Sequence, residues 1–447
     1  MAKPIENSRN GCALQGALQA VQEIEGFVPI LHSTAGCGIQ QHLGGNAVSG
    51  YQSAGDLGGF SVPSTNVIEK QVVFGGTSRL REQIKNTVKV INGDLYIVLS
   101  GCTTELVGDD IPAMTKEAQE QGTPIISVST PGFKGKAHFG YEALVKTIIQ
   151  YFAGDSKGAD EKIKGLVNIF GIIPKQDVFW KGNLAELKRI LEAVGLKVNT
   201  LFGLDQGIEQ WKDVTKAELN LVFSNWGLGP AKYLEENYKT PYIDFYTIPV
   251  GSEDTAALIN KVAGRLDIDK TVIDSFIKAE EKQVNHYVKN ILDTYFENDF
   301  QKEFTLVGDL STVLGIGRFL VRYFGLIATT VIITDSHDAV SENVIGEIGD
   351  IISYDNIEVF FTEDGTEIND IIRNSGSELI IGSSLERDIA RELGIPLLAV
   401  AFPLIDKVIL NKTYAGFRGA VSLIEDLSSE ILKSVEEAEL EYIKELI

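Results

Sequence analysis

Short apolar runs alternate with helix-like, amphipathic stretches along almost the whole chain. Residues 95–100 have the composition of a buried strand, and residues 111–121 after them have the pattern of a helix. Strands that alternate with helices are typical of βαβ units, in which parallel strands are covered by helices on both faces. The sequence therefore predicts an α/β fold built from doubly wound, Rossmann-like parallel sheets.

The alternation falls into three groups, from which we expect three domains. Residues 1–160 would form an N-terminal α/β domain, residues 161–297 a middle α/β domain with a polar bridging helix at its end, and residues 298–447 a C-terminal α/β domain. A chain of this length can hold several domains, each with its own core. The predicted strands are residues 95–100, 124–129, 166–170, 197–201, 219–223, 304–307, 328–334, 357–361, 379–381 and 397–400. The predicted helices are residues 111–121, 183–194, 271–296, 311–323, 386–393 and about 417–432.

The charge balance excludes one class of partner. The net charge of −22 arises from 62 acidic and 40 basic residues. Nucleic-acid-binding proteins need a positive surface, so we do not expect this chain to bind nucleic acid.

No apolar run approaches the roughly 20 residues of a membrane span, and the first residues lack the pattern of a signal peptide. We therefore expect a cytoplasmic protein that stays out of the membrane, with its thiols reduced.

The only three cysteines, Cys12, Cys37 and Cys102, all lie in the first quarter of the chain, and each is next to a glycine. Thiolates that share an iron–sulfur cluster need a backbone that bends tightly around the cluster, and glycine permits this. The alternative is three unrelated free cysteines beside ordinary turn glycines. Their spacing matches no short ligand motif such as C-x2-C, so spacing alone leaves both interpretations open.

Other polar residues in these segments have both a functional and a structural interpretation. His32 could donate a hydrogen bond to a cluster sulfur or could simply be a core histidine. Glu105, Asp109 and Asp110 are best explained as carboxylates at helix N-termini, which the helix dipole favours. The sequence contains no P-loop lysine motif, so any use of ATP would belong to a partner protein.

Several motifs resemble those of nitrogenase component 1. The segment HSTAGC at residues 32–37 resembles the family's HG-x-x-GC, and VFGG at residues 73–76 resembles the FGG that follows it. The segment CTTELVGDD at residues 102–110 is similar to C-x-x-E-x-x-GDD and is the most specific match. FPLIDK at residues 402–407, followed by YAGFRGA at residues 414–420, resembles the β-type FP-x-x-DR and GY-x-GA. The resemblance thus covers nearly the whole chain.

The resemblance implies three α/β domains and, for a β-type chain, three cysteine ligands to an iron–sulfur cluster at the interface with an α-type partner. By motif position those ligands would be Cys12, Cys37 and Cys102. The cluster would be of the 8Fe-7S P-cluster type or a 4Fe-4S cluster. An α-type chain holds its catalytic cofactor through a later cysteine and a late histidine. Here no cysteine follows Cys102 and the last histidine is His337, so the chain resembles the β type.

The implied function is that of an oxidoreductase subunit with no catalytic residues of its own. In a heterotetramer with an α-like subunit, the cluster would relay electrons from a separate ATP-dependent iron protein to the active site in the partner. Two alternatives stay open: a non-catalytic scaffold for metallocluster assembly, and a nitrogenase-like reductase with a 4Fe-4S cluster and a substrate other than dinitrogen. Gly132 stands where molybdenum-type β chains have a serine that can ligate the oxidised cluster, so nitrogen fixation itself is not implied.

Overall fold

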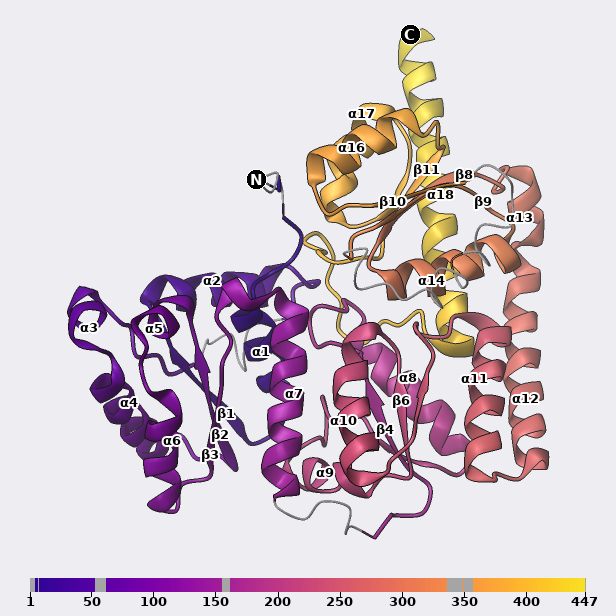
Figure 1. The fold of residues 1–447 in the computed structure, drawn as a ribbon. Coiled ribbons are helices and arrows are strands. Elements are labelled where there is room, and N and C mark those ends of the chain that lie inside the picture. The colour runs from indigo at the N-terminus through magenta and orange to yellow at the C-terminus, as the bar shows by residue number, and fades with distance from the viewer. Residues whose placement is uncertain are drawn as a thin grey trace.

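The computed structural model describes residues 5–6, 8–52, 62–154, 161–335, 348 and 357–446. Three sheets of three, four and five strands form separate layers, and all strand pairings within these sheets are parallel (Figure 1). Helices cover the sheets, and the described chain contains no helix that is both long enough and apolar enough to span a membrane. The predicted α/β class with parallel, doubly wound sheets is therefore confirmed.

The first sheet has the order β1-β2-β3 and is covered on both faces. Because successive residues of a strand point to opposite faces, Leu95, Ile97 and Leu99 join one apolar core, whereas Tyr96 and Val98 join another. The first core includes residues of α1 and α7, and the second includes residues of α4 and α6. The elements of this part are α1 (Ala13–Val21), β1 (Phe27–His32), α2 (Ala35–Ala47), α3 (Glu69–Phe74), α4 (Thr77–Val90), β2 (Leu95–Ser100), α5 (Cys102–Val107), α6 (Ile111–Glu120), β3 (Ile125–Val128) and α7 (Ala137–Ala153).

The second sheet has the order β5-β4-β6-β7, so the direction of winding reverses between β4 and β6. In open α/β sheets, the carboxyl ends of the strands at such a reversal border the ligand sites. The elements of this part are β4 (Leu166–Phe170), α8 (Trp180–Ala193), β5 (Lys197–Asn199), α9 (Ile208–Lys212), β6 (Leu219–Val222), α10 (Leu228–Tyr238), β7 (Tyr242–Asp244), α11 (Gly251–Leu266), α12 (Lys270–Val288) and α13 (Leu292–Glu297).

The third sheet has the order β10-β9-β8-β11-β12, the strand order of a dinucleotide-binding fold over its first five strands. The long helix α18 starts against α11 and α12 of the middle part and continues past the third sheet (Figure 1). The elements here are β8 (Glu303–Gly308), α14 (Leu310–Phe319), β9 (Ile327–Ile333), β10 (Glu358–Phe361), α16 (Gly365–Asn374), β11 (Leu379–Gly382), α17 (Arg387–Leu393), β12 (Leu397–Ala399) and α18 (Gly416–Leu446).

The predicted strands and helices correspond to observed elements, with shifts at their ends. The helix expected over residues 183–194 begins three residues earlier, at Trp180. Gly195, just beyond it, has φ = +92°, which suits a glycine after a helix end. The last helix, expected to end near residue 432, continues to Leu446. The sequence analysis gave no bounds for the strands β1 and β7 or for the helices α1, α2, α3, α4, α5, α7, α9, α10, α11 and α16. Each sheet lies within one of the three expected domains, whose boundaries remain a prediction.

Candidate metal centre

The three cysteines lie at the N-terminal ends of three helices. Cys12 is the N-cap residue of α1, Cys37 lies in the first turn of α2, and Cys102 is the first residue of α5. All three are free thiols of intermediate exposure. The partial positive charge at a helix N-terminus favours a negatively charged group such as a thiolate. The fold therefore offers each sulfur an environment that suits a metal ligand.

Gly132 brings Cys12 and Cys102 together. It follows β3, and its backbone N–H donates a hydrogen bond to Cys102 Sγ at 3.1 Å. A Cβ atom placed on Gly132 would lie 3.0 Å from Cys12 Cβ and 3.4 Å from Cys102 Sγ. The φ angle of Gly132 is not in the left-handed region. The glycine is therefore needed for space beside the two cysteines and not for its backbone conformation.

Helix α2 adds Cys37 to this group. Gln41 lies one turn after Cys37 on the same helix, and its Nε2 donates to Cys12 Sγ at 3.9 Å. Thr34 Oγ1 donates to Cys37 Sγ at 3.7 Å. Each sulfur thus accepts one hydrogen bond, from a backbone amide, a side-chain amide or a hydroxyl. Hydrogen bonds to sulfur are a principal means by which proteins tune iron–sulfur clusters. We refer to Cys12, Cys37, Cys102 and Gly132 as the cysteine corner.

The cysteine corner is open and does not form a cage. Within the described ranges, no three His, Cys, Asp or Glu side chains converge closely enough to hold a single metal ion. Gly36 and Gly38, on either side of Cys37, would meet nothing within 4 Å if they carried a Cβ atom. The glycines beside Cys37 therefore border open space in this chain. The glycine beside Cys102 differs, because a Cβ atom on Gly101 would lie 2.0 Å from the Ser33 hydroxyl.

The carboxyl ends of β1, β2 and β3 position the corner. These strands pair in parallel register, so the segments that follow them emerge at one edge of the sheet. Cys12 reaches the same edge through two backbone hydrogen bonds: Ala13 N donates to Gly135 O at 3.0 Å, and Ala137 N donates to Gly11 O at 2.8 Å. Cys102 follows the strand that was predicted at residues 95–100, but nothing in the sequence analysis indicated that Cys12 is linked to the segment before α7.

Two glycines let α1 pack directly on α7. A Cβ atom on Gly16 would lie 1.9 Å from Ala137 O, and one on Gly140 would lie 1.8 Å from Ala13 O. The backbones therefore touch at both crossing points, which fixes the position of the helix that starts at Cys12.

The acidic residues after Cys102 hold the surrounding loops in place. Glu105 accepts hydrogen bonds from the hydroxyls of Ser100 and Ser129, which links the segments after β2 and β3. Asp110 caps α6 by accepting a hydrogen bond from Ala113 N at 3.0 Å, as expected of a carboxylate at a helix N-terminus. The hydrogen bonds of Glu105 and Asp110 thus give both carboxylates a structural role.

His32 is a core histidine that binds a carboxylate. It is fully buried, and its Nε2 lies 3.0 Å from Asp109 Oδ2, while its Nδ1 lies 3.1 Å from Thr65 Oγ1. Burial lowers the pKa of His32, and the neighbouring Asp109 carboxylate partly opposes that effect. Asp109 also accepts a hydrogen bond from Gly76 N at 2.7 Å. Both ring nitrogens of His32 therefore bind oxygen atoms of neighbouring loops, and neither binds a cysteine sulfur.

The segment before Cys12 is held by the third part of the chain. Arg9 is 5% exposed and forms an ion pair with the buried Glu386, and its Nη1 donates to Ser383 Oγ at 3.0 Å. Nearer the cysteine, Asn10 Nδ2 donates to Glu363 Oε2 at 3.2 Å. The sequence analysis missed this anchor because its partners lie more than 350 residues apart.

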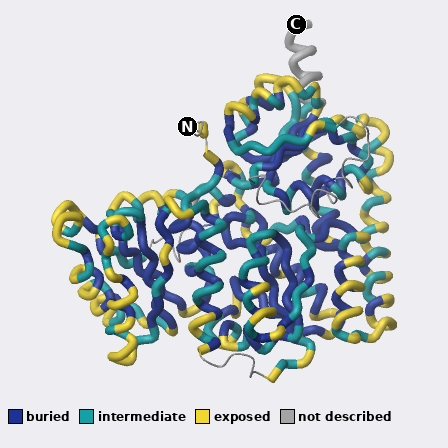
Figure 2. Tube along the Cα trace, viewed as in Figure 1, coloured by how far each residue is buried: buried dark blue, intermediate teal, exposed yellow. Residues whose placement is uncertain are grey.

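Exposed apolar side chains surround the cysteine corner. Phe74 is 81% exposed and Leu106 is 77% exposed, and further exposed apolar residues lie on α2, α3 and the turn after β3. Figure 2 shows many exposed positions in the part of the trace that contains α3 and α5. These further residues are Ile39, Leu43, Val73 and Phe133. Apolar surface of this kind, gathered around polar groups, is typical of an interface with another protein.

Comparisons with known proteins identify the family of this chain. The sequence profile of the family described as Nitrogenase component 1 type Oxidoreductase matches residues 12–432. The chain is 25% identical to the nitrogenase vanadium-iron protein beta chain of Trichormus variabilis, over 95% of this chain and 93% of the relative. It is 24% identical to the nitrogenase molybdenum-iron protein beta chain of Methanococcus maripaludis, over 94% and 93%. It is also 26% identical to the nitrogenase iron-molybdenum cofactor biosynthesis protein NifE of Clostridium pasteurianum, over 87% and 81%.

A solved structure, described as nitrogenase Cp1 at pH 6.5, superimposes with a TM-score of 0.81. The superposition covers 98% of this chain and 95% of the solved chain, with 22% sequence identity, and it supports the assignment of the fold. Because the family profile spans nearly the whole chain, including all three cysteines, this chain belongs to the nitrogenase component 1 family of oxidoreductases.

Proposed function

We propose that this chain is the β-like subunit of a cytoplasmic component 1 complex, and that Cys12, Cys37 and Cys102 hold an iron–sulfur cluster at its interface with an α-like subunit. The observation that carries the proposal is the cysteine corner: three free thiols, each with one hydrogen-bond donor, in an open group. An open group of three thiols suits a cluster that is completed by ligands from a second chain. The bound group would be an 8Fe-7S P-cluster type or a 4Fe-4S cluster and would supply one-electron redox chemistry.

The residues around the cysteines would adjust this cluster. The Gly132 N–H, the Gln41 amide and the Thr34 hydroxyl donate to sulfur and would stabilise the more negatively charged, reduced state. The exposed apolar residues around the corner would be covered by the α-like subunit, which would also exclude water from the cluster. Electrons would arrive from a separate ATP-dependent iron protein and leave to an active site in the partner.

A scaffold function is the second candidate, and the similarity to NifE, a cofactor biosynthesis protein, is the observation that favours it. Both candidate functions need the cysteines. In the first the bound cluster passes electrons on, whereas in the second the cluster itself is passed to another protein. The test is to purify the complex anaerobically, measure iron per heterodimer, and mix it with a reduced iron protein and MgATP. Repeated reduction and reoxidation of the cluster during turnover supports electron relay. Transfer of the cluster to an acceptor protein, without turnover, supports the scaffold.

The chain by itself should bind no nucleotide. Its sequence has no P-loop motif to cradle phosphates, and hydrolysis of ATP would belong to the iron protein. Equilibrium dialysis of the purified chain with labelled ATP should therefore show no saturable binding. Stoichiometric binding would contradict this division of labour between the two proteins.

Replacing Gly132 by serine should change the cluster. The backbone tolerates a side chain there, but its Cβ would press on Cys12 Cβ at 3.0 Å and lie beside Cys102 Sγ. The hydroxyl would then be within reach of a metal bound by these sulfurs. We expect altered electron paramagnetic resonance of the oxidised complex and a shifted reduction potential. Gly38→Ser, beside Cys37 but facing open space, is the matched control. Equal spectra for Gly132→Ser and the parent complex would show that this position does not face the cluster.

A further inference from the structure

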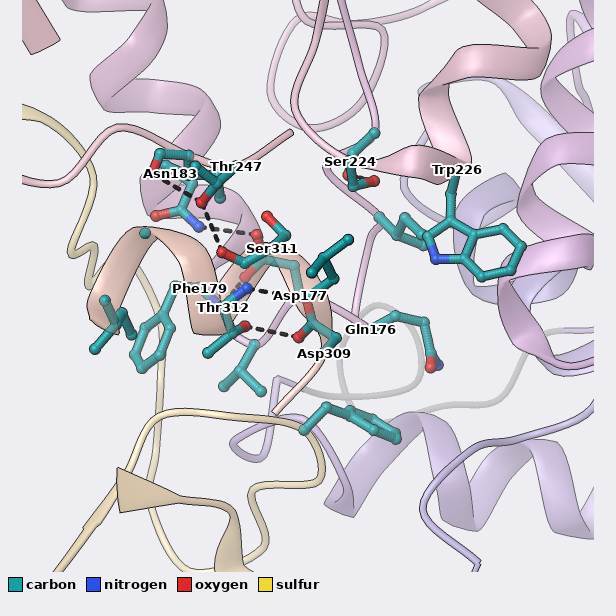
Figure 3. Close-up of a pocket in the computed structure, with 18 of the residues that line it drawn as sticks. Gln176, Asp177, Phe179, Asn183, Ser224, Trp226, Thr247, Asp309, Ser311 and Thr312 are labelled. Atoms are coloured by element: carbon teal, nitrogen blue, oxygen red, sulfur yellow. Dashed lines mark hydrogen bonds between the residues drawn. The ribbon is translucent and has the colours of Figure 1, made fainter. Parts of the chain in front are cut away.

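A cavity of about 90 Å³ lies between the middle and third parts of the chain. This volume is several times the roughly 10–15 Å³ that one water molecule requires. Its walls come from segments that follow β4, β6 and β7 on one side and β8, β9 and β12 on the other. The two sides are joined directly, since Thr247 Oγ1 donates to Ser311 O at 2.6 Å (Figure 3). The cavity therefore lies where the carboxyl ends of two parallel sheets meet, the position at which α/β folds bind ligands.

The described lining of the cavity carries three carboxylates among its many neutral polar groups. Asp177, Asp309 and Asp335 all line the cavity, and its described lining contains no lysine or arginine. Each carboxylate already accepts a backbone hydrogen bond. Asp177 accepts one from Phe179 N at 2.9 Å and Asp309 one from Thr312 N at 3.1 Å (Figure 3). Asp335 accepts one from Leu310 N at 2.7 Å. These bonds hold the carboxylates in place.

A further acceptor points to a ligand independently of the carboxylates. Gln176 lines the same cavity and is only 5% exposed. Its Nε2 donates to Gln19 Oε1 at 2.7 Å, whereas its Oε1 has no hydrogen-bond partner in the described part of the chain. A buried acceptor without a donor costs stability. A ligand that donates a hydrogen bond would remove that cost.

Aromatic rings complete the wall. Trp226 is stacked on the His138 ring, with centroids 4.6 Å apart, and both residues line the cavity. Phe179 and Tyr414 line it too, with ring centroids 4.5 Å apart. Aromatic faces attract cations and pack against short alkyl groups.

The charge of the cavity at neutral pH is negative. Burial raises the pKa of Asp177 and that of Asp335 to about 6, with Asp309 adding to both shifts. Burial lowers the pKa of His138 to about 4, although Asp309 opposes this. The other charged groups that act on these residues are Lys136 and Glu363, which pair with each other. Above pH 6 Asp177 and Asp335 therefore face the cavity mainly as anions, beside a neutral His138.

We propose that this cavity binds a small organic ammonium ion, with Gln176 Oε1 accepting one of its N–H groups, Asp177, Asp309 and Asp335 supplying the negative charge that attracts it, and the aromatic rings covering its alkyl part. A bare metal ion suits the cavity less well, because no three of its described acidic or histidine side chains converge on one point. An anion is disfavoured by the three carboxylates. Because the ligand would touch both the middle and the third parts, its binding would restrain their relative position. The proposal does not depend on the cysteine corner.

The test is calorimetric titration of the complete chain, purified with its partner, with propylammonium chloride, 1-propanol and sodium propionate. We expect saturable 1:1 binding of propylammonium only, and tighter binding at pH 7.5 than at pH 5, where Asp177 and Asp335 are protonated. Asp309→Asn keeps a residue that can cap α14 but removes one charge, and it should weaken binding by about tenfold or more.

Asp364→Asn is the matched control, because Asp364 is the N-cap of another ten-residue helix, α16, and does not line the cavity. It should leave the affinity for propylammonium unchanged. The proposal is wrong if propanol binds as tightly as propylammonium, if Asp364→Asn weakens binding as much as Asp309→Asn, or if propylammonium does not bind. Binding of magnesium or manganese chloride that displaces propylammonium would also overturn it, in favour of a metal site.

Discussion

Replacing Cys102 by alanine should remove most of the iron from the purified complex while the chain remains folded. Cys102 Sγ accepts a hydrogen bond from Gly132 N and lies beside the position of a Gly132 Cβ atom, as Cys12 does. Loss of even an indirect partner of a metal ligand typically costs about 10–100-fold in metal affinity, and loss of a thiolate ligand should cost at least about tenfold. The residue begins a helix, where alanine is well tolerated, so the fold should survive.

The measurement is iron per heterodimer after anaerobic purification, together with the electron paramagnetic resonance of the reduced complex. Thr103→Ala changes the next residue of the same helix and controls for disturbance of α5. Cluster loss should also weaken association with the α-like subunit, because metal binding is coupled to assembly. A Cys102→Ala complex that retains the iron and the spectrum of the parent would show that this thiol is not a ligand.

The fold could be predicted because its signals are local. Buried parallel strands are continuous apolar runs, and β2, β4, β6 and β8 were found from such runs alone. By contrast, β1 is interrupted by Pro29, and β7 has the sequence Tyr-Ile-Asp, so neither forms a continuous apolar run.

The sequence analysis predicted which residues would be the cluster ligands, and that stays a prediction, but it did not predict how the fold brings them together. The glycine next to each cysteine and the family-like motif around Cys102 indicated a cluster. The close contact between the α1 and α7 backbones at Gly16 and Gly140 could not be inferred from the sequence, because the identity of a glycine does not indicate which segment packs against it. The sequence analysis also did not show why residue 132 is a glycine, whereas the structure places the constraint in the space beside Cys12 and Cys102.

The site also depends on a contact between the two ends of the sequence. Arg9 lies three residues before Cys12, and its ion pair with Glu386 is almost completely buried, with side chains 3% and 1% exposed. Glu386 accepts further hydrogen bonds from Ser383 N at 2.7 Å and Ser383 Oγ at 2.8 Å. The carboxylate thus joins the segment before Cys12 to the turn that precedes α17.

Arg9→Ala should therefore destabilise the chain by about 3–5 kcal/mol, because it leaves the Glu386 carboxylate buried without its cation. The midpoint of urea unfolding and the rate of proteolysis before Cys12 would measure this loss. Replacing both partners, in Arg9→Met with Glu386→Leu, removes the stranded charge and should restore most of the stability. Arg373→Ala breaks the exposed pair with Glu392 and should change the midpoint little. If Arg9→Ala unfolds at the same urea concentration as Arg373→Ala, the buried pair does not hold the segment that carries Cys12. If it unfolds earlier and also loses iron, the third part of the chain contributes to the cysteine corner through this one contact.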